Sequence, residues 1–270
     1  MRRSRLIFEN QGTPISYDDV GSGNAVLFIH GHPFNRTMWT PQVQSLRWNY
    51  RTIAPDLRGY GESARGSETV YTQERFPADL VRLLDHLSVA RACIVGLSMG
   101  GQIAMEFARA FPDRTAAIVL AATFPQAETP EGVTNRNRMA DRVLSEGMAL
   151  AGSEMLSKLV GPASLKRQPS IASAVYRMIC ATDPAGAAAA LRGRALRRDY
   201  RESLAQIQAP CLIVLGTDDA YSTVDEAEAM HTAIPNSRLE IFPDIGHMPN
   251  LEEEDRFNRH LHELLAVIPW

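Results

Sequence analysis

Residues 92–101 read Ala-Cys-Ile-Val-Gly-Leu-Ser-Met-Gly-Gly, and this stretch decides the fold. Its first part is a continuous apolar run, which is typical of a parallel strand buried on both faces. Its second part matches the pattern Gly-x-Ser-x-Gly and leads into a helical segment, 102–111. A serine at such a strand-to-helix turn is held in a tight conformation, with its hydroxyl exposed at the amino end of the helix. We therefore predict that Ser98 is a nucleophile.

A glycine-rich turn between a strand and a helix can also hold a nucleotide phosphate. The spacing of Gly96, Gly100 and Gly101 fits neither the dinucleotide fingerprint nor the P-loop, and the segment lacks the P-loop lysine. The nucleophile is the favoured interpretation.

Similar apolar runs on both sides of this stretch predict the rest of a sheet. Strands are expected at 25–30, 51–55, 92–96, 116–122, 211–216 and 238–242, after an opening hairpin of 6–10 and 13–18. A helix is expected over 72–89, where apolar residues recur three or four positions apart. Alternating strands and helices indicate an α/β fold, with a mostly parallel sheet and helices on both faces.

The alternation stops between about residues 124 and 200, where the sequence becomes rich in Ala, Met and Arg and helical in pattern. The strand pattern resumes at 209–210. We expect a core domain formed by 1–123 and 201–270, with 124–200 inserted as a helical cap across the carboxyl ends of the strands.

A serine hydroxyl needs a base and an orienting acid. His247 is the best-placed histidine, because it follows the strand predicted at 238–242 and precedes the final helix. The acid is expected after the strand at 211–216, where Asp218 and Asp219 are adjacent. The order Ser, Asp, His is the one used by sheets of this kind. Both acids remain candidates at this point.

Two backbone amides are expected to stabilise the oxyanion that forms on acyl transfer. One belongs to Met99, the residue after the nucleophile, and the other to His32, in the loop that follows the strand at 25–30. The His32 side chain either points into the pocket or is structural, and His30 is expected to form only local hydrogen bonds.

Composition excludes several other classes of protein. The chain has 270 residues, 45% of them hydrophobic, and a net charge of −3, so no basic face for nucleic acid is implied. No apolar run is long enough to span a membrane, and the apolar part of the basic start, 6–8, is too short for a signal peptide, so a cytoplasmic location is expected. The three cysteines, Cys93, Cys180 and Cys211, lack metal or redox spacing and are interpreted as small buried hydrophobes.

Five motifs, in this order, span nearly the whole chain: His30-Gly31-His32-Pro33, Asp56-Leu57-Arg58-Gly59-Tyr60-Gly61-Glu62-Ser63, Gly96–Gly101, Gly216–Asp219 and Gly246–Pro249. The set resembles the α/β-hydrolase fold family. In that family the acid usually lies three residues after the glycine that ends the strand at 211–216, which implies Asp219, with Asp218 as the alternative. Within that family the chain is similar to bacterial carboxylesterases and to 3-oxoadipate enol-lactonase-like hydrolases. Epoxide hydrolases and haloalkane dehalogenases of this fold have an aspartate at the position of Ser98, so those two activities are set aside.

The resemblance implies hydrolysis of a small-molecule carboxylic ester or lactone through an acyl-enzyme, with no metal or organic cofactor. The same triad serves cofactor-free haloperoxidases and carbon–carbon bond hydrolases, which remain alternatives. A ligand receptor built on this fold is an alternative of another class. Potential pocket residues of the cap include the side chains of Met139, Met148, Met155, Tyr176, Met178, Arg138, Arg142 and Arg177. Neither the substrate nor the oligomeric state can be predicted from the sequence.

Overall fold

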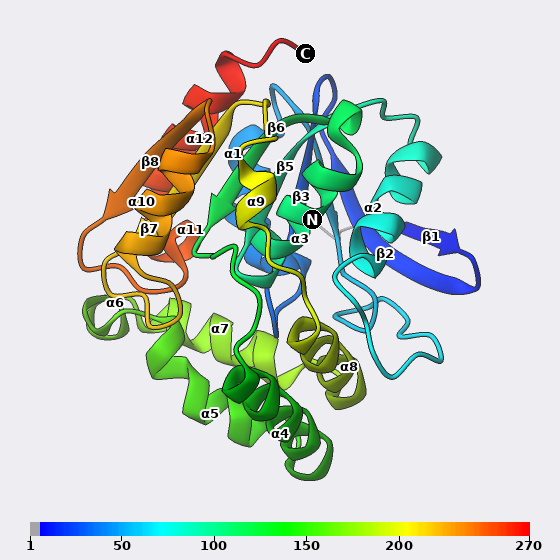
Figure 1. The fold of residues 1–270 in the computed structure, drawn as a ribbon, viewed down its shortest axis with the longest axis vertical. Coiled ribbons are helices and arrows are strands. Elements are labelled where there is room, and N and C mark those ends of the chain that lie inside the picture. The colour runs from blue at the N-terminus through cyan, green and yellow to red at the C-terminus, as the bar shows by residue number, and fades with distance from the viewer. Residues whose placement is uncertain (1–5) are drawn as a thin grey trace.

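The computed structural model describes residues 6–270, and its centre is one eight-stranded sheet (Figure 1). The strand order is β1-β2-β4-β3-β5-β6-β7-β8, in which β1 and β2 run antiparallel to their neighbours and the others are parallel. The strands are β1 Leu6–Asn10, β2 Thr13–Val20, β3 Ala25–Ile29, β4 Arg51–Pro55, β5 Ala92–Leu97, β6 Thr115–Ala121, β7 Cys211–Gly216 and β8 Ser237–Phe242. The predicted α/β class with a mostly parallel sheet is confirmed.

The helices complete the chain between these strands. They are α1 Thr40–Leu46, α2 Arg75–His86, α3 Met99–Ala110, α4 Pro130–Glu146, α5 Met148–Leu159, α6 Pro162–Arg167, α7 Pro169–Cys180, α8 Pro184–Ala195, α9 Arg201–Leu204, α10 Val224–Ala233, α11 Pro249–Glu252 and α12 Glu254–Ala266. Two short 3₁₀ helices cover Arg36–Trp39 and Pro112–Arg114.

The sheet separates two apolar cores because successive side chains of a strand point to opposite faces. In β3, Val26 and Phe28 join one core, while Leu27 and Ile29 join the other. The first core also contains the apolar faces of α1 and α12, and the second contains those of α2, α3 and α10. Both faces of the central strands are therefore covered, which explains their uninterrupted apolar sequence.

Two of the predicted helices begin at other residues than expected. The helix predicted over 72–89 is α2, Arg75–His86. It starts late because the chain before it pairs with α8, where the Tyr71 N–H donates to the Ala189 carbonyl at 2.9 Å, and it ends before Ser88, whose φ is 54°. The helix predicted from residue 102 begins three residues earlier, at Met99, because it starts directly at the turn that carries Ser98.

Helices α4 to α8 gather below the carboxyl ends of the parallel strands in Figure 1, within the segment predicted as an insertion. Several hydrogen bonds join this segment to the sheet domain. Thr182 donates its hydroxyl to the Pro33 carbonyl at 2.8 Å, and the His247 N–H donates to the Leu159 carbonyl at 3.0 Å. The helices are thus attached to the loops that follow β3 and β8.

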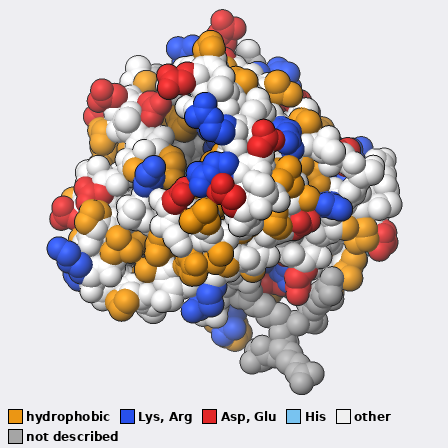
Figure 2. Space-filling view, turned by 90° about the horizontal axis from the view of Figure 1, so that it is seen from below, with side chains coloured by type: hydrophobic (Ala, Val, Ile, Leu, Met, Phe, Trp, Pro, Cys, Tyr) orange, Lys and Arg blue, Asp and Glu red, His pale blue; other side chains and the backbone are white. Residues whose placement is uncertain are grey.

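Two surface features complete the description. No helix among residues 6–270 is long and apolar enough to cross a membrane. On the face shown in Figure 2, which looks up at the lower helices, basic and acidic side chains are intermixed.

Cys93 and Cys211 are buried as expected, but the prediction for Cys180 is wrong, because it lies exposed at the last position of α7. The basic residues Arg2, Arg3 and Arg5 lie outside the described residues.

Candidate active site

Ser98 occupies a strained backbone conformation between β5 and α3. Its φ is 58° and its ψ is −117°, a backbone conformation that residues other than glycine rarely adopt. The neighbouring backbone leaves no room for larger residues: a Cβ on Gly96 would lie 2.1 Å from the Gly100 carbonyl oxygen, and one on Gly100 would lie 2.2 Å from the Ile29 carbonyl oxygen. The glycines are therefore required by close backbone approach, and the turn presents Ser98 at the first turn of α3.

His247 lies in the loop after β8, and its ring is fixed by Asp219, in the loop after β7. The His247 Nδ1 lies 2.8 Å and 2.9 Å from the two oxygens of the Asp219 carboxylate. Asp218, the alternative acid, is exposed, and its carboxylate accepts a 3.4 Å hydrogen bond from the Thr217 hydroxyl. The structure thus pairs Asp219, and not its neighbour, with the histidine.

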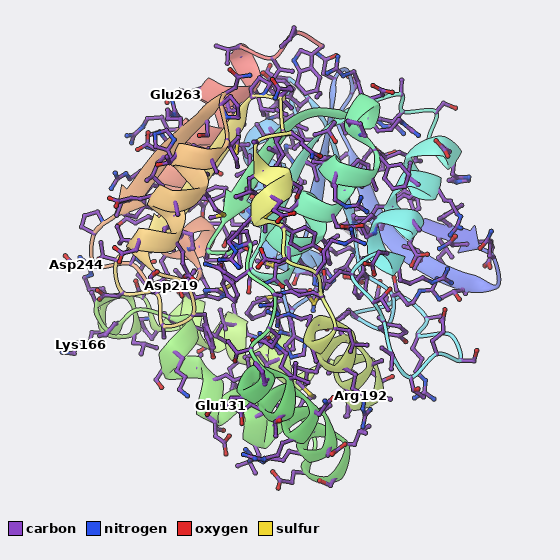
Figure 3. The ribbon with its side chains drawn as sticks, in the orientation of Figure 1. Glu131, Lys166, Arg192, Asp219, Asp244 and Glu263 are labelled. Carbon is purple, nitrogen blue, oxygen red and sulfur yellow. The ribbon has the colours of Figure 1, made fainter. Side chains whose placement is uncertain are left out.

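The carboxylate of Asp219, which is labelled in Figure 3, is buried and has several hydrogen-bond donors around it. It accepts hydrogen bonds from the Ser222 hydroxyl at 2.6 Å and from the Tyr221 N–H at 2.8 Å. Burial acts to raise the pKa of Asp219, but His247 and these donors outweigh it, so the pKa is held below the ordinary value. Asp219 is accordingly ionised at neutral pH and holds His247 through Nδ1, which leaves Nε2 as the ring nitrogen available to act as a base.

The loop after β3 carries two buried histidines with different partners. His30 Nδ1 lies 2.9 Å from the Gly31 carbonyl, and His30 Nε2 accepts the Leu57 N–H at 2.9 Å, so the ring also connects this loop to the one after β4. The prediction of purely local bonding for His30 is therefore wrong. Burial lowers the pKa of His30 to about 4, which keeps it neutral.

His32 faces the same pocket as Ser98, while its Nδ1 lies 2.7 Å from the Tyr60 hydroxyl. Burial, together with the charge of Arg194, holds the pKa of His32 well below its usual range. The His32 side chain therefore combines the two roles that the sequence left open: it lines the pocket as a neutral group and is fixed by a buried partner.

A buried arginine anchors the end of this loop. Arg36 forms ion pairs with Asp18 at 3.1 Å, with Asp56, and with Glu62 at 2.6 Å. Its backbone N–H also donates to the Asp56 carboxylate at 2.8 Å. The segment that carries His32 is thus fastened to β2 and to the loop after β4.

A pocket of about 260 Å³ brings Ser98, His247 and His32 together. Its remaining lining comes from helices α4, α5 and α8 and from two loops, through the residues Phe124, Arg136, Met139, Met155, Leu159, Leu191, Arg194, Ala220 and Tyr221. Most of these lining residues are apolar, and the two charged ones are both arginines.

Sequence reasoning found part of this wall. Met139 and Met155 line the pocket, whereas Met148, Tyr176 and Met178 are not among its lining residues. None of the three arginines considered, Arg138, Arg142 and Arg177, reaches it. The two that do, Arg136 and Arg194, were missed because only the packing of α4 against α8 shows which helix faces turn inward.

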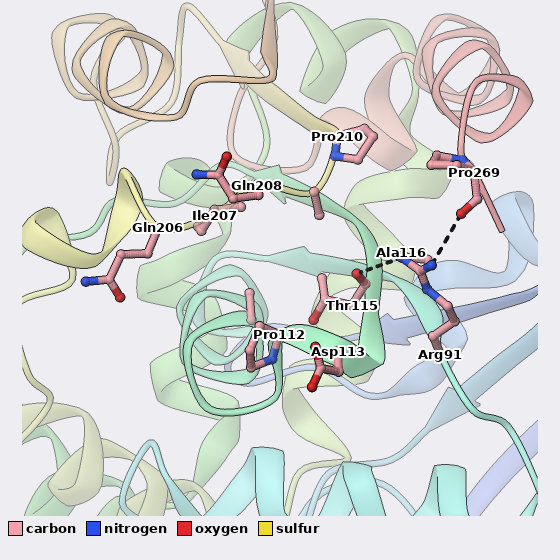
Figure 4. A pocket seen from close by; sticks show the side chains of 12 residues that line it. Arg91, Pro112, Asp113, Thr115, Ala116, Gln206, Ile207, Gln208, Pro210 and Pro269 are labelled. Atoms are coloured by element: carbon pink, nitrogen blue, oxygen red, sulfur yellow. Dashed lines mark hydrogen bonds between the residues drawn. The ribbon is translucent and has the colours of Figure 1, made fainter.

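A second pocket, of about 350 Å³, lies near the amino end of β6 (Figure 4). Arg91 crosses one side of it and donates to the carbonyls of Thr115, at 3.4 Å, and Pro269, at 3.3 Å. Its lining holds none of the predicted catalytic residues, so the pocket at Ser98 is the candidate site.

Comparison with known proteins gives a consistent result. A family model described as the alpha/beta hydrolase fold matches residues 24–254. A solved thermophilic esterase from Thermogutta terrifontis, with malate bound, is 36% identical with a TM-score of 0.93, over 97% of this chain and 98% of that one. The 3-oxoadipate enol-lactonase 1 of Acinetobacter baylyi is 28% identical over 94% of each chain. A bromoperoxidase structure from Bacillus anthracis is 25% identical with a TM-score of 0.85, over 97% of this chain and 100% of that one.

The family match extends over most of the chain and includes the strained serine turn, the loop after β7 and the loop after β8. The chain therefore belongs to the α/β-hydrolase fold family, and it is a hydrolase with esterase and enol-lactonase relatives.

Proposed function

We propose that this protein is a serine hydrolase that cleaves a carboxylic ester or lactone of a small molecule, with Ser98, His247 and Asp219 as its catalytic triad. The observation that carries the proposal is the pairing of the buried Asp219 carboxylate with His247 Nδ1 at 2.8 Å, beside a pocket that both His247 and the strained Ser98 line. Esterase and enol-lactonase relatives support the same reaction class.

In the proposed reaction, His247 Nε2 takes the proton of Ser98 while the serine oxygen attacks the ester carbonyl. The backbone amides of Met99 and His32 stabilise the resulting oxyanion, and His247 then donates the proton to the departing alcohol. Water repeats these steps on the acyl-enzyme and releases the acid. Asp219 keeps the imidazole in the productive tautomer and stabilises its cation.

Residues 124–200 are proposed to act as a cap over the core formed by 1–123 and 201–270. The apolar side chains of Met139, Met155 and Leu159 contribute to the pocket from this segment. Such a cover would exclude bulk water, which strengthens every electrostatic interaction at the reacting carbonyl.

A second candidate function is a peroxide-dependent reaction, in which hydrogen peroxide attacks the same acyl-enzyme. The similarity of the chain to a bromoperoxidase structure supports this candidate. It requires the same three catalytic residues and differs only in the nucleophile that attacks the acyl-enzyme. Hydrogen peroxide should then increase the consumption of ester and generate a peracid.

The proposal is tested with a series of p-nitrophenyl esters of increasing acyl length, comparing the wild type with Ser98→Ala. We expect multiple turnovers in the wild type, with a preference for short acyl chains set by the 260 Å³ pocket, and loss of turnover in the variant. A folded wild type that hydrolyses neither these esters nor any simple lactone would refute the ester hydrolase proposal and would direct attention to carbon–carbon cleavage or ligand reception.

A further inference from the structure

The part of the pocket formed by α4 and α8 contains an excess of positive charge. Arg136 and Arg197 share a single carboxylate, that of Glu128, with the Arg197 pair at 2.8 Å. Arg194, from the last turn of α8, is only 7% exposed and lines the same pocket as Arg136 and His32. Among residues 6–270, no carboxylate lies within ion-pairing distance of Arg194, so three guanidinium groups are opposed by one acidic side chain.

The hydrogen bonding of Arg194 is also incomplete. Within the described part of the chain, its one side-chain hydrogen bond is a long one of 3.4 Å, from Nε to the Gln102 side-chain oxygen. A guanidinium group has five N–H donors arranged to receive a planar carboxylate in bidentate fashion. An unpaired buried charge is costly, whereas the same charge becomes favourable once an anion approaches it.

Arg194 is also in an environment that disfavours its charge. Burial, followed by the charges of Arg136 and Arg197, lowers the pKa of Arg194 well below its ordinary value, as expected for a guanidinium group without an acidic partner.

The other ionisable groups around Arg194 do not supply that partner. His32 stays neutral, and burial raises the pKa of Tyr60, so its hydroxyl also stays neutral. The Asp219 carboxylate does not line the pocket and is paired with His247 and with the Ser222 hydroxyl of its own loop.

We infer that Arg194 is a specificity-determining residue that binds a carboxylate carried by the substrate, so that the protein prefers anionic esters over neutral esters of the same shape. This inference rests on the proposed function, because it places the carboxylate at one end of the pocket and the ester carbonyl at Ser98. Arg136 also lines the pocket and adds to the positive field, but it is paired with Glu128, which it shares with Arg197.

The test uses one neutral ester and two anionic esters derived from it. Ethyl butyrate is the parent; replacing its terminal acyl methyl with a carboxylate gives monoethyl succinate, and replacing its terminal alcohol methyl gives the butyryl ester of glycolate. Hydrolysis is followed in a pH-stat for the wild type, for Arg194→Gln and for Arg138→Gln. The last variant removes an exposed arginine of α4 that does not line the pocket, and it is the matched control.

We expect at least one anionic ester to be hydrolysed with a higher kcat/KM than ethyl butyrate. Arg194→Gln should lower that kcat/KM about 10- to 100-fold, the range expected for a lost charge-assisted hydrogen bond, and should lower the kcat/KM of ethyl butyrate by a much smaller factor. Arg138→Gln should behave as the wild type. An equal loss on neutral and anionic esters would overturn the inference, because Arg194 would then act on the reaction itself; so would a wild type that prefers ethyl butyrate to both anionic esters.

A binding measurement keeps the inference separate from the proposed function. Succinate should raise the Tm of the wild type and of Ser98→Ala, but not that of Arg194→Gln, which should fold well because it loses an uncompensated buried charge. If no ester is hydrolysed but succinate stabilisation depends on Arg194, the hydrolase proposal fails and the carboxylate site stands. If succinate stabilises Arg194→Gln as much as the wild type, the carboxylate site is refuted.

Discussion

At the scale of single residues, the two adjacent acids Asp218 and Asp219 have opposite environments. The carboxylate of Asp219 is fully buried and contacts His247 Nδ1, whereas Asp218 is exposed on the same loop. The difference arises from the turn after β7, where the Asp218 N–H donates to the Ile245 carbonyl and the Asp219 N–H donates to Gly216. The same substitution, Asp to Asn, can therefore be compared at the residue that contacts His247 and at its exposed neighbour.

We expect Asp219→Asn to lower kcat for ester hydrolysis by roughly 10³- to 10⁴-fold, because an amide cannot hold the imidazole in the productive tautomer or stabilise its cation. Asp218→Asn should retain kcat close to that of the wild type. Steady-state kinetics on one ester measure both variants. A larger loss in Asp218→Asn than in Asp219→Asn would show that the acid has been assigned to the wrong residue.

At the scale of elements, the loop that carries His247 is attached to the segment between α5 and α6 through Glu252. This side chain is buried, and its oxygens accept the N–H groups of Gly161 at 2.9 Å, Gly246 at 3.1 Å and Met248 at 3.1 Å. The two residues that flank His247 are therefore held by the same carboxylate that holds the helical segment. We expect Glu252 to act as a positioning residue for the base.

Glu252→Gln should leave at least one of these N–H groups facing an amide NH₂, which costs about 1–3 kcal/mol of stability for a buried unsatisfied donor. It should also lower kcat more than it changes KM, because His247 would be less well placed for proton transfer. Urea unfolding and steady-state kinetics measure the two effects, with Glu254→Gln as the control on an exposed neighbour. A normal kcat in a destabilised variant would restrict Glu252 to a structural role.

At the scale of the whole molecule, the strands that the sequence predicts most clearly also position the predicted catalytic residues. Ser98, Asp219 and His247 follow β5, β7 and β8, which run parallel, so the three loops meet at one edge of the sheet. This arrangement can be predicted because buried parallel strands have distinctive apolar sequences and the serine turn has a local motif. Arg194 and Arg136 could not be predicted, since their place in the pocket depends on how α4 and α8 pack against each other.

The most direct test of the central claim, that Ser98 is the nucleophile, is to label the folded protein with a fluorophosphonate and locate the adduct by peptide mass spectrometry. A serine activated by His247 should react once per chain, at Ser98, and labelling should disappear in both Ser98→Ala and His247→Ala. Labelling at another residue, or continued ester turnover in a protein whose Ser98 is not labelled, would contradict the account.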